Sequence, residues 1–450
     1  MRASFGKFGK SGAAALAMAT AIAGASVIAL GLSATPAFAK DKEKDKAPAK
    51  VTASPEFVKV AAPFQKQLQD VEAKKGKVSA EELKAAALPL VPQLAAMEPS
   101  VKNVADKVTW GQWQQIVGGY VDDKPLVLKG LQAMFDSGQL PPETSTTVAF
   151  FIGYTAYQLK DYPTTIKALG PVVAGNYKDE AAAAVLADAF EKSGQPAQAL
   201  DALKTAIAAK KAAGGVSPED WYSQGMRIAV KGKLNAASLE WSFLQVQAYP
   251  NALNWLNAGQ LLNYASTGFQ AQETLDVERL IDRSGGLSSD PKYVEREYVA
   301  YLQAADYRRN PGEVVRIAEK GIAAGALKAD DTFVKEALTN ARPRIAADKA
   351  SLAGLATDAA KAPTGVSAAA TADAFLSYGD SAKAEELYKL ALTKGGVDAN
   401  KDRILTRLGI AQIDQAKYPD AKATLAQVGG VRQQLAALWS IFADQKAAGK

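Results

Sequence analysis

Residues 183–206 read AAVLADAFEKSGQPAQALDALKTA, which is the pattern of two short helices joined by a tight turn. In the first half, apolar and small residues recur at spacings of three and four and so share one helical face: Ala183, Leu186, Ala187 and Phe190. Gly194 permits the left-handed backbone that ends a helix, and Pro196 suits the first turn of the next helix. Ala199, Leu203 and Ala206 continue the apolar stripe of that second helix.

The same arrangement recurs along the chain with a period of about 34 residues. Gly153 precedes Ala187 by 34 residues, and Gly225 precedes Gly259 by the same number. A small residue at this place lets the two helices of a unit approach closely. We read seven copies, near residues 153, 187, 225, 259, 302, 372 and 409. Two more are inferred at roughly 108–137 and 330–362, the latter with one helix around Phe333 to Ala341 and another from Pro343 onward.

This pattern of small and aromatic residues, with a turn such as Lys160-Asp161-Tyr162, resembles the tetratricopeptide repeat family over roughly residues 108–430. Glu278 departs from the family pattern, which usually has Ala there, and Gln412 replaces a large residue. The resemblance implies an all-α fold, a right-handed α-α superhelix or solenoid of degenerate helix pairs, with a concave face that binds extended peptides or partner helices. Irregular helix pairs without a true repeat are the alternative.

The first 39 residues have the layout of a secretory signal peptide. A basic start with Arg2, Lys7 and Lys10 precedes an Ala-rich apolar run, and residues 37–39 form a small-x-small cleavage pattern. We expect cleavage after Ala39 and a periplasmic or secreted mature chain. An uncleaved membrane anchor is the alternative, because the apolar run approaches the roughly 20 residues that span a bilayer. Its many Ala and Gly residues make it a weak span.

Composition excludes several kinds of site. The chain has no Cys and no His, so it has neither a Ser-His or Cys-His nucleophile pair nor a zinc site with those ligands. Phosphate-binding, dinucleotide, metalloprotease and calcium-loop motifs are also absent. Ser289-x-x-Lys292 matches the first element of a Ser-Lys dyad, but its companion motifs are missing. We therefore expect no cofactor, no metal and no enzymatic activity.

The charge is nearly balanced in the predicted mature chain. The formal net charge is +6, and removal of the first 39 residues leaves 50 basic and 47 acidic residues, a net charge of +3. Such a balance lacks the basic surface that nucleic-acid binding requires. No nucleic acid is therefore expected as a partner.

The predicted organisation has five parts. A charged disordered tether follows the signal peptide, because KDKEKDKAPAK mixes both signs of charge without large apolar residues. Ser54-Pro55-Glu56 then has the order of an N-terminal helix cap. The expected segments are a signal peptide (1–39), the tether (40–54), an N-terminal helical region (55–107), the repeat array (108–430) and a C-terminal capping helix (431–450).

These features predict an exported protein-protein interaction scaffold of the cell envelope, which binds another envelope protein or a peptide segment of one. A cell-wall-associated hydrolase and a glycan-binding superhelical protein are the alternatives. Within the array, the groove side of successive first helices is expected to carry the partner-binding residues: Tyr154, Tyr157, Asp188, Tyr222, Met226, Gln260 and Asn263. Tyr offers contact area and a hydrogen-bonding tip, and Met adapts to irregular surfaces. Ordinary packing between neighbouring helices is the alternative for each.

Overall fold

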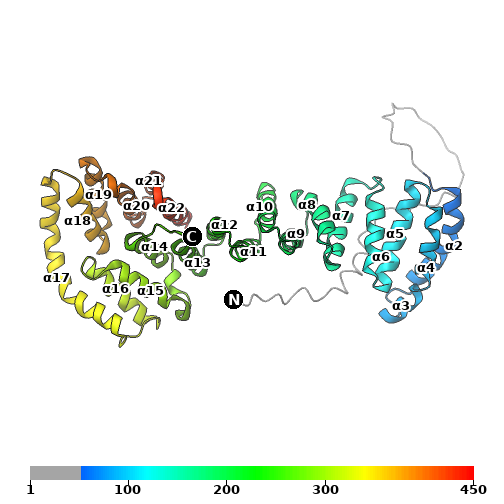
Figure 1. Cartoon of the computed structure of the whole chain (residues 1–450), viewed down its shortest axis with the longest axis horizontal. Coiled ribbons are helices and arrows are strands. Elements are labelled where there is room, and N and C mark those ends of the chain that lie inside the picture. The colour runs from blue at the N-terminus through cyan, green and yellow to red at the C-terminus, as the bar shows by residue number, and fades with distance from the viewer. Residues whose placement is uncertain (1–51, 450) are drawn as a thin grey trace, which may run out of the picture. The chain divides into compact units, whose positions relative to one another are not determined.

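A computed structural model describes residues 52–449, so the predicted signal peptide and nearly all of the predicted tether lie outside the described residues. Every regular element in this range is a helix, and successive helices pack as pairs (Figure 1). The all-α helix-pair solenoid predicted from the sequence is confirmed. Among these residues, no helix combines the length and the apolarity that crossing a membrane requires.

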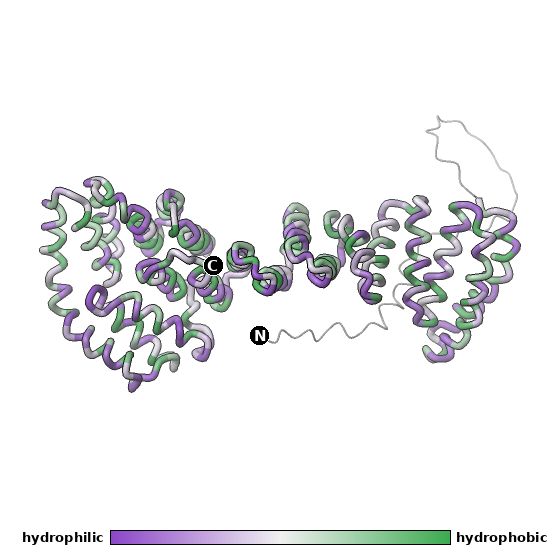
Figure 2. Tube along the Cα trace, viewed as in Figure 1, coloured by the Kyte–Doolittle hydropathy of each residue, from purple (hydrophilic) through white to green (hydrophobic). Residues whose placement is uncertain are grey.

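The chain divides into two compact units. The boundary between them in the sequence lies within α11 (Glu219–Lys231), between Trp221 and Tyr222. Within the described residues, the first unit contains nine helices before α11: α2 (Pro55–Glu72), α3 (Ala80–Ala87), α4 (Leu90–Met97), α5 (Val104–Val121), α6 (Lys124–Phe135), α7 (Pro142–Gln158), α8 (Tyr162–Ala174), α9 (Ala181–Lys192) and α10 (Pro196–Ala212). Along each helix, apolar and polar residues alternate as an amphipathic pattern requires (Figure 2).

The start of the first unit is anchored by a buried carboxylate. Ser54 caps α2, as expected, and also donates from its backbone N and its Oγ to Asp106, at 2.8 and 2.7 Å. The core beneath it joins α2 to α5 through Phe57 and Phe64, whose rings lie 5.9 and 5.0 Å from that of Trp113. Ser54, the last residue of the predicted tether, therefore belongs to the folded unit.

The second unit contains the remaining helices: α12 (Asn235–Ala248), α13 (Ala252–Ala265), α14 (Ala271–Arg283), α15 (Pro291–Ala305), α16 (Pro311–Ala323), α17 (Thr332–Lys361), α18 (Val366–Ser377), α19 (Ser381–Lys394), α20 (Lys401–Asp414), α21 (Tyr418–Leu425) and α22 (Gln433–Ala447). Most of its buried apolar residues form one continuous core, which extends from Leu239 to Ala443. A single core of this extent couples the stability of the helices that share it.

The prediction of two helices at 330–362 is wrong. The structure has one helix of 30 residues there, α17, with Pro343 inside it. Proline removes one backbone hydrogen bond and usually ends a helix. Here apolar residues on both sides of the proline are buried, Leu338 before it and Leu352 after it, and α17 packs against both α16 and α18. This packing keeps the helix continuous across the proline.

The second unit closes on itself, because its last helix packs against its first ones (Figure 1). We predicted that the C-terminal helix covers the final repeat, and α22 indeed packs on α20 and α21. It also reaches α13, where the ring of Phe442 meets Trp255 edge-on at 5.6 Å. Gln445 accepts from Trp255 Nε1 at 3.2 Å and donates to the carbonyl of Val246 on α12 at 2.8 Å.

The small residues predicted at helix crossings lie where the paired helices touch. A Cβ added to Gly153 would lie 2.4 Å from the Leu169 side chain, and one added to Gly225 would lie 2.3 Å from the Trp241 ring. Such distances leave no room for a larger residue. The repeat frame read from the sequence is therefore correct at these crossings.

Replacing Gly225 with Leu is expected to destabilise the second unit by roughly 1–3 kcal/mol, because Trp241 is completely buried and cannot move aside without disturbing the core. Denaturant unfolding of the purified protein measures this change. Gly354→Leu is the matched control: Gly354 is an exposed residue of α17 with open space around its Cα. That control should be neutral or slightly stabilising, because Leu favours helix over Gly. Equal stability of Gly225→Leu and the wild type would mean that this crossing is misassigned.

Candidate functional site

The predicted groove residues of the first unit form an internally bonded cluster. The hydroxyl of Tyr157 on α7 donates to Asp188 on α9, and Lys192 donates to the Tyr157 oxygen at 3.0 Å. Lys192 also pairs with Asp188 at 2.8 Å and lies over the Tyr157 ring at 5.0 Å. The hydrogen bonds to Asp188 and Tyr157 raise the pKa of Lys192. Tyr154 is half-buried and stacks on Phe150.

In the second unit, Tyr222 is part of the core. It is 7 % exposed, and its ring meets those of Trp241 and Tyr249 edge-on, at 6.5 and 5.8 Å. Met226, one turn further along α11, is half-buried. Burial of Tyr222 in an aromatic cluster indicates packing at this position.

Gln260 and Asn263, both on α13, point at buried carboxyl groups. Gln260 donates to Glu297 on α15 at 2.8 Å, and Asn263 donates to Glu278 on α14 at 3.0 Å. The structure thus brings two sets of the predicted residues together. Tyr157 bonds Asp188, and Gln260 and Asn263 each bond one of two buried glutamates. Partner binding by the seven predicted residues remains a prediction.

Tyr222→Ala is expected to destabilise the second unit by roughly 1.5–3 kcal/mol, the value of burying a large apolar side chain. Thermal unfolding, read alongside partner recovery, tests the packing interpretation. Tyr264→Ala is the control, because Tyr264 on α13 is 81 % exposed and should change stability little. A Tyr222→Ala protein with wild-type stability and lost partner recovery would instead place Tyr222 in the binding surface.

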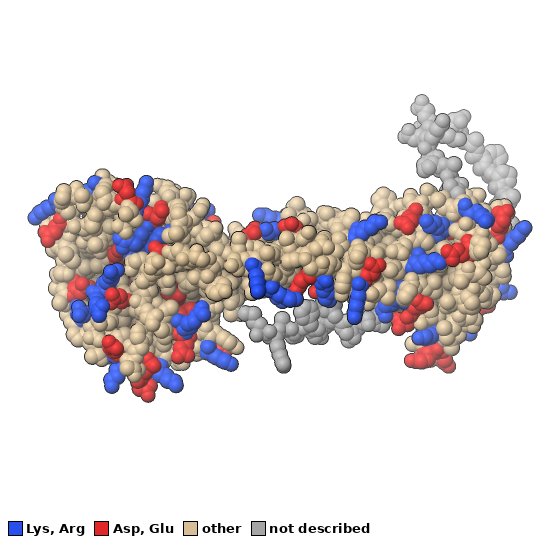
Figure 3. Space-filling model, viewed as in Figure 1, with Lys and Arg blue, Asp and Glu red and all other residues tan. Residues whose placement is uncertain are grey.

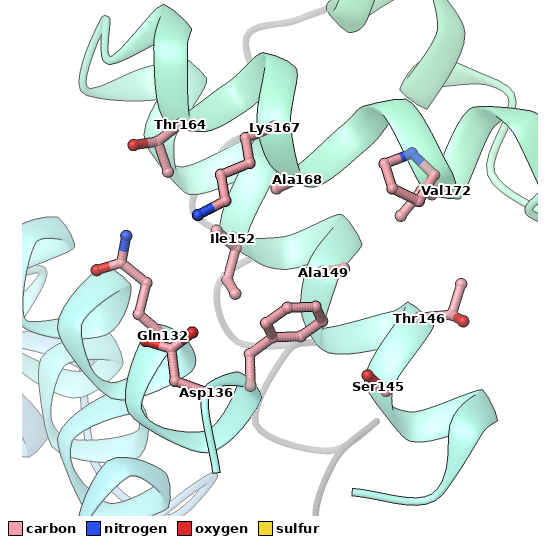
Figure 4. A pocket seen from close by; sticks show the side chains of 12 residues that line it. Gln132, Asp136, Ser145, Thr146, Ala149, Ile152, Thr164, Lys167, Ala168 and Val172 are labelled. Carbon is pink, nitrogen blue, oxygen red and sulfur yellow. The ribbon is translucent and has the colours of Figure 1, made fainter. Parts of the chain in front are cut away.

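A cavity of about 500 Å³ lies between α6, α7 and α8 in the first unit (Figure 4). Its apolar lining comes from all three helices: Phe135, Ala149, Ile152, Ala168, Pro171 and Val172. Polar side chains complete it: Gln132, Asp136, Ser145, Thr146, Thr164 and Lys167. Phe135 is 41 % exposed, so its ring is accessible from outside the cavity.

The local sequence explains why this cavity forms. On α7, Ser145, Ala149 and Ile152 follow one another at spacings of four and three, so they share a face. Ala149 and Ala168 are too small to fill the space between neighbouring helices, and Pro171 inside α8 carries no backbone N–H to pair. The result is an apolar surface surrounded by amide, hydroxyl and charged groups, which is the usual chemistry of a binding pocket. Tyr154 and Tyr157 lie on another face of α7.

A second cavity, of about 460 Å³, lies between α14, α16, α17 and α18. Most of its charged groups already have partners. Arg283 makes two bonds to Asp414, at 2.8 and 2.9 Å, and Arg316 pairs with Asp282 at 2.9 Å. Because these pairs satisfy one another, this cavity offers less to a partner than the one in the first unit. On the face of each unit that Figure 3 shows, basic and acidic side chains are interspersed.

A buried ionic cluster around Asp276 holds the second unit closed. Three arginines bond this carboxylate: Arg279 at 2.9 Å, Arg407 at 3.0 Å and Arg432 at 2.8 Å. All four side chains are at most 2 % exposed. Burial alone would raise the pKa of Asp276, but the three guanidinium groups overcome it and hold that pKa well below its usual range.

The cluster extends beyond Asp276 to three further carboxylates. Arg279 also forms a bidentate pair with Glu313 on α16, at 2.9 and 2.6 Å. Arg407 reaches Asp373 on α18 at 2.8 Å, and Arg432 reaches Glu273 at 2.8 Å. Helices α14, α16, α18 and α20 and the turn before α22 are therefore joined by charge-assisted hydrogen bonds. In the part of the chain that the structure describes, no group of three or more acidic residues is placed to hold a metal ion.

Comparison with known proteins gives matches among solved structures, at low sequence identity. No protein-family model matches the chain, and no curated protein matches it. Among solved structures, the chain is similar to the TPR2AB domain of yeast Sti1 in its pHSP90 complex, with 13 % identity, coverage of 68 % of this chain and 97 % of that one, and a TM-score of 0.23. It is also similar to the P58(IPK) TPR domain, with 13 % identity, coverage of 79 % and 99 %, and a TM-score of 0.22. The helix pairs described above establish the fold independently of these similarities.

Sequence reasoning missed both the cavity of the first unit and the Asp276 cluster. The cavity depends on small residues of two different helices, Ala149 on α7 and Ala168 on α8, which line the same space only in the folded chain. The cluster did leave a signal, because α14 carries acidic and basic residues at helical spacing on a face that should be apolar: Glu273, Asp276, Arg279 and Arg283. Charged residues at expected core positions are expensive unless paired, so they predict buried partners elsewhere in the chain.

Proposed function

We propose that the chain is an exported protein-protein interaction scaffold of the cell envelope, whose first unit binds an extended segment of another envelope protein. The observation that carries this proposal is the cavity between α6, α7 and α8, with its apolar lining and its partly exposed Phe135. Export is supported by the basic start, the apolar run and the cleavage pattern before Lys40.

The lining of the cavity suits one class of partner. Ile152, Val172 and Phe135 offer contact to an apolar side chain inserted from outside. Gln132, Thr146 and Thr164 can donate and accept hydrogen bonds, as an extended peptide backbone requires. Asp136 and Lys167 supply one charge of each sign, which favours a segment without a strong net charge of its own.

Phe135→Ala tests the proposal. An aromatic side chain at the centre of an interface typically contributes 1–3 kcal/mol, so recovery of the partner from envelope extract should fall roughly tenfold or more. The melting temperature should change little, because Phe135 is the last residue of α6 and is partly exposed. The partner is identified by crosslinking from a photoreactive residue at position 167.

Leu88→Ala is the matched control, because Leu88 is a 50 % exposed apolar residue of the same unit outside the cavity. Equal recovery by Phe135→Ala, Leu88→Ala and the wild type would reject the cavity as the binding site. Turnover of peptidoglycan by the purified protein, abolished by a single carboxylate substitution, would reject the scaffold function itself. Amino-terminal sequencing of the exported form tests the predicted start at Lys40.

A further inference from the structure

Two buried glutamates lie next to each other in the second unit without a matching positive charge. Glu278 on α14 is 1 % exposed and Glu297 on α15 is 2 % exposed. One oxygen of each has an amide donor: Asn263 bonds Glu278 Oε1 at 3.0 Å, and Gln260 bonds Glu297 Oε1 at 2.8 Å. The other oxygen of each carboxyl, Oε2, is buried without any hydrogen-bond partner, and so is Asn263 Oδ1.

Charged groups around the pair do not neutralise it. Arg296 is the cation that acts on it, with Nε 3.4 Å from Glu297 Oε1, but its side chain is 79 % exposed. From α13 the pair receives only the two amides, and the short turn at Gly286–Ser288 has no titratable group. On α14 itself, Arg279 is bound by Asp276 and Glu313.

Other charged side chains of α14 and α22 form ion pairs with other partners. Asp282, one turn beyond Glu278 on α14, is bound by Arg316 and Lys320. From α22, Asp444 pairs with Lys422. The contrast with Asp276, two residues before Glu278 and bonded by three arginines, shows that buried carboxylates elsewhere in this unit do receive counterions.

We propose that Glu278 holds a proton in the folded protein near neutral pH, and that this proton makes the stability of the second unit pH-dependent. Ionising Glu278 is costly, because its carboxyl group is buried beside a second buried carboxyl group and has no ion-pair partner of its own. A protonated carboxyl gains a donor, so its Oε2 can bond an oxygen that otherwise has no partner. A proton also needs no empty volume, which matters because the three unpartnered oxygens are buried.

The direction of the pH effect follows from the pKa. Burial and the neighbouring Glu297 raise the pKa of Glu278 well above its usual range. Between the unfolded value, about 4.3, and this raised value, the folded state binds a proton that the unfolded state releases. Stability from the pair is therefore complete below the unfolded pKa and is lost as pH rises through the folded pKa. With one linked proton, the folding equilibrium constant falls by up to tenfold per pH unit in that window.

The test compares full-length wild-type protein with Glu278→Gln from pH 5 to pH 8.5. Denaturant unfolding of the wild type should show a stability that decreases with pH, whereas Glu278→Gln should show little of this decrease. The reason is that the glutamine amide keeps a donor where the Glu278 proton lies, at every pH. Glu295→Gln is the matched control, because Glu295 is an exposed residue of α15, and it should retain the wild-type slope.

A spectroscopic measurement keeps the proposal testable if Glu278→Gln folds poorly. The infrared band of a protonated carboxylic acid should be present in the wild type at pH 7 and absent in Glu278→Leu, which removes that carboxyl group and places an apolar side chain at the buried position. Absence of this band in the wild type, or an unchanged pH slope in Glu278→Gln, would overturn the proposal. Stabilisation of the wild type by Ca²⁺ or Mg²⁺, lost in Glu278→Gln, would assign the oxygens to a metal ion and overturn it as well.

Discussion

Replacing Asp276 with Asn is expected to lower the free energy of unfolding of the second unit by about 3–5 kcal/mol. The substitution keeps the size of the side chain but removes the negative charge that Arg279, Arg407 and Arg432 share. Three buried guanidinium groups would then face one another with less compensation, and an uncompensated buried charge is among the most destabilising features in a protein core.

The place of the loss is as informative as its size. Asp276 links α14 to α20 and to the turn before α22, so the variant should open where these segments meet. Hydrogen exchange should accelerate in α14, α20 and α22 and remain unchanged in the first unit, such as in α5. Because the chain has two units, this regional readout is preferable to a single transition.

Asp358→Asn is the matched control, since Asp358 is an exposed residue near the end of α17. Its effect should stay within about 0.5 kcal/mol. A loss below 1 kcal/mol in Asp276→Asn, or faster exchange confined to the first unit, would mean that the cluster does not hold the second unit closed.

The same cluster predicts a loss of stability in acid. The folded pKa of Asp276 is held below its unfolded value of about 3.9, so the stability from this group is present above that value and is lost as pH falls through the folded pKa. Asp276→Asn should therefore depend less on pH below about 4 than the wild type does. This window lies below that of Glu278, and its slope has the opposite sign, so the two effects can be separated.

Trp439→Ala is the second substitution with a large expected effect, a loss of about 3–5 kcal/mol. Trp439 on α22 is completely buried, and its Nε1 donates to the backbone carbonyl of Asp276 at 3.2 Å. Arg283 lies over its ring at 5.8 Å, and Phe442 packs edge-on at 5.8 Å. Truncation leaves a cavity between the last and the first helices of the unit. The melting temperature should fall by roughly 10 °C, which calorimetry can measure.

Phe442 adds an internal check on this result, because its ring touches both Trp439 and Trp255. If α22 closes the unit, Phe442→Ala should destabilise the same segments as Trp439→Ala. Tyr264→Ala serves as the control for loss of an exposed aromatic side chain. Preserved stability in both α22 variants would show that this helix is dispensable to the closed unit.

Spacing along the chain was sufficient to predict the helices and their pairing. Gly153 and Gly225 lie at crossings because a helix repeats every 3.6 residues, and a small residue on the shared face lets two neighbours in sequence approach. The cap at Ser54 could be predicted for the same local reason, and the Ser54 side chain accepts a hydrogen bond from the backbone N–H of Phe57. Glu278 was visible as a departure from the repeat, yet Glu297 was not recognised as its neighbour.

Tertiary structure alone decided the features that join distant segments. Arg407 and Arg432 reach Asp276 across 131 and 156 residues, and no local pattern records such a pairing. The continuity of α17 through Pro343 depends on apolar contacts on both sides of the proline, which outweigh its local preference to end a helix. The cavity beside Phe135 depends on residues from three helices, α6, α7 and α8, lining one space. Helical periodicity is a property of neighbouring residues, so the sequence by itself determined the elements and their pairs. Closure, buried ion pairs and cavities arise from contacts between elements, so only the folded chain decided them.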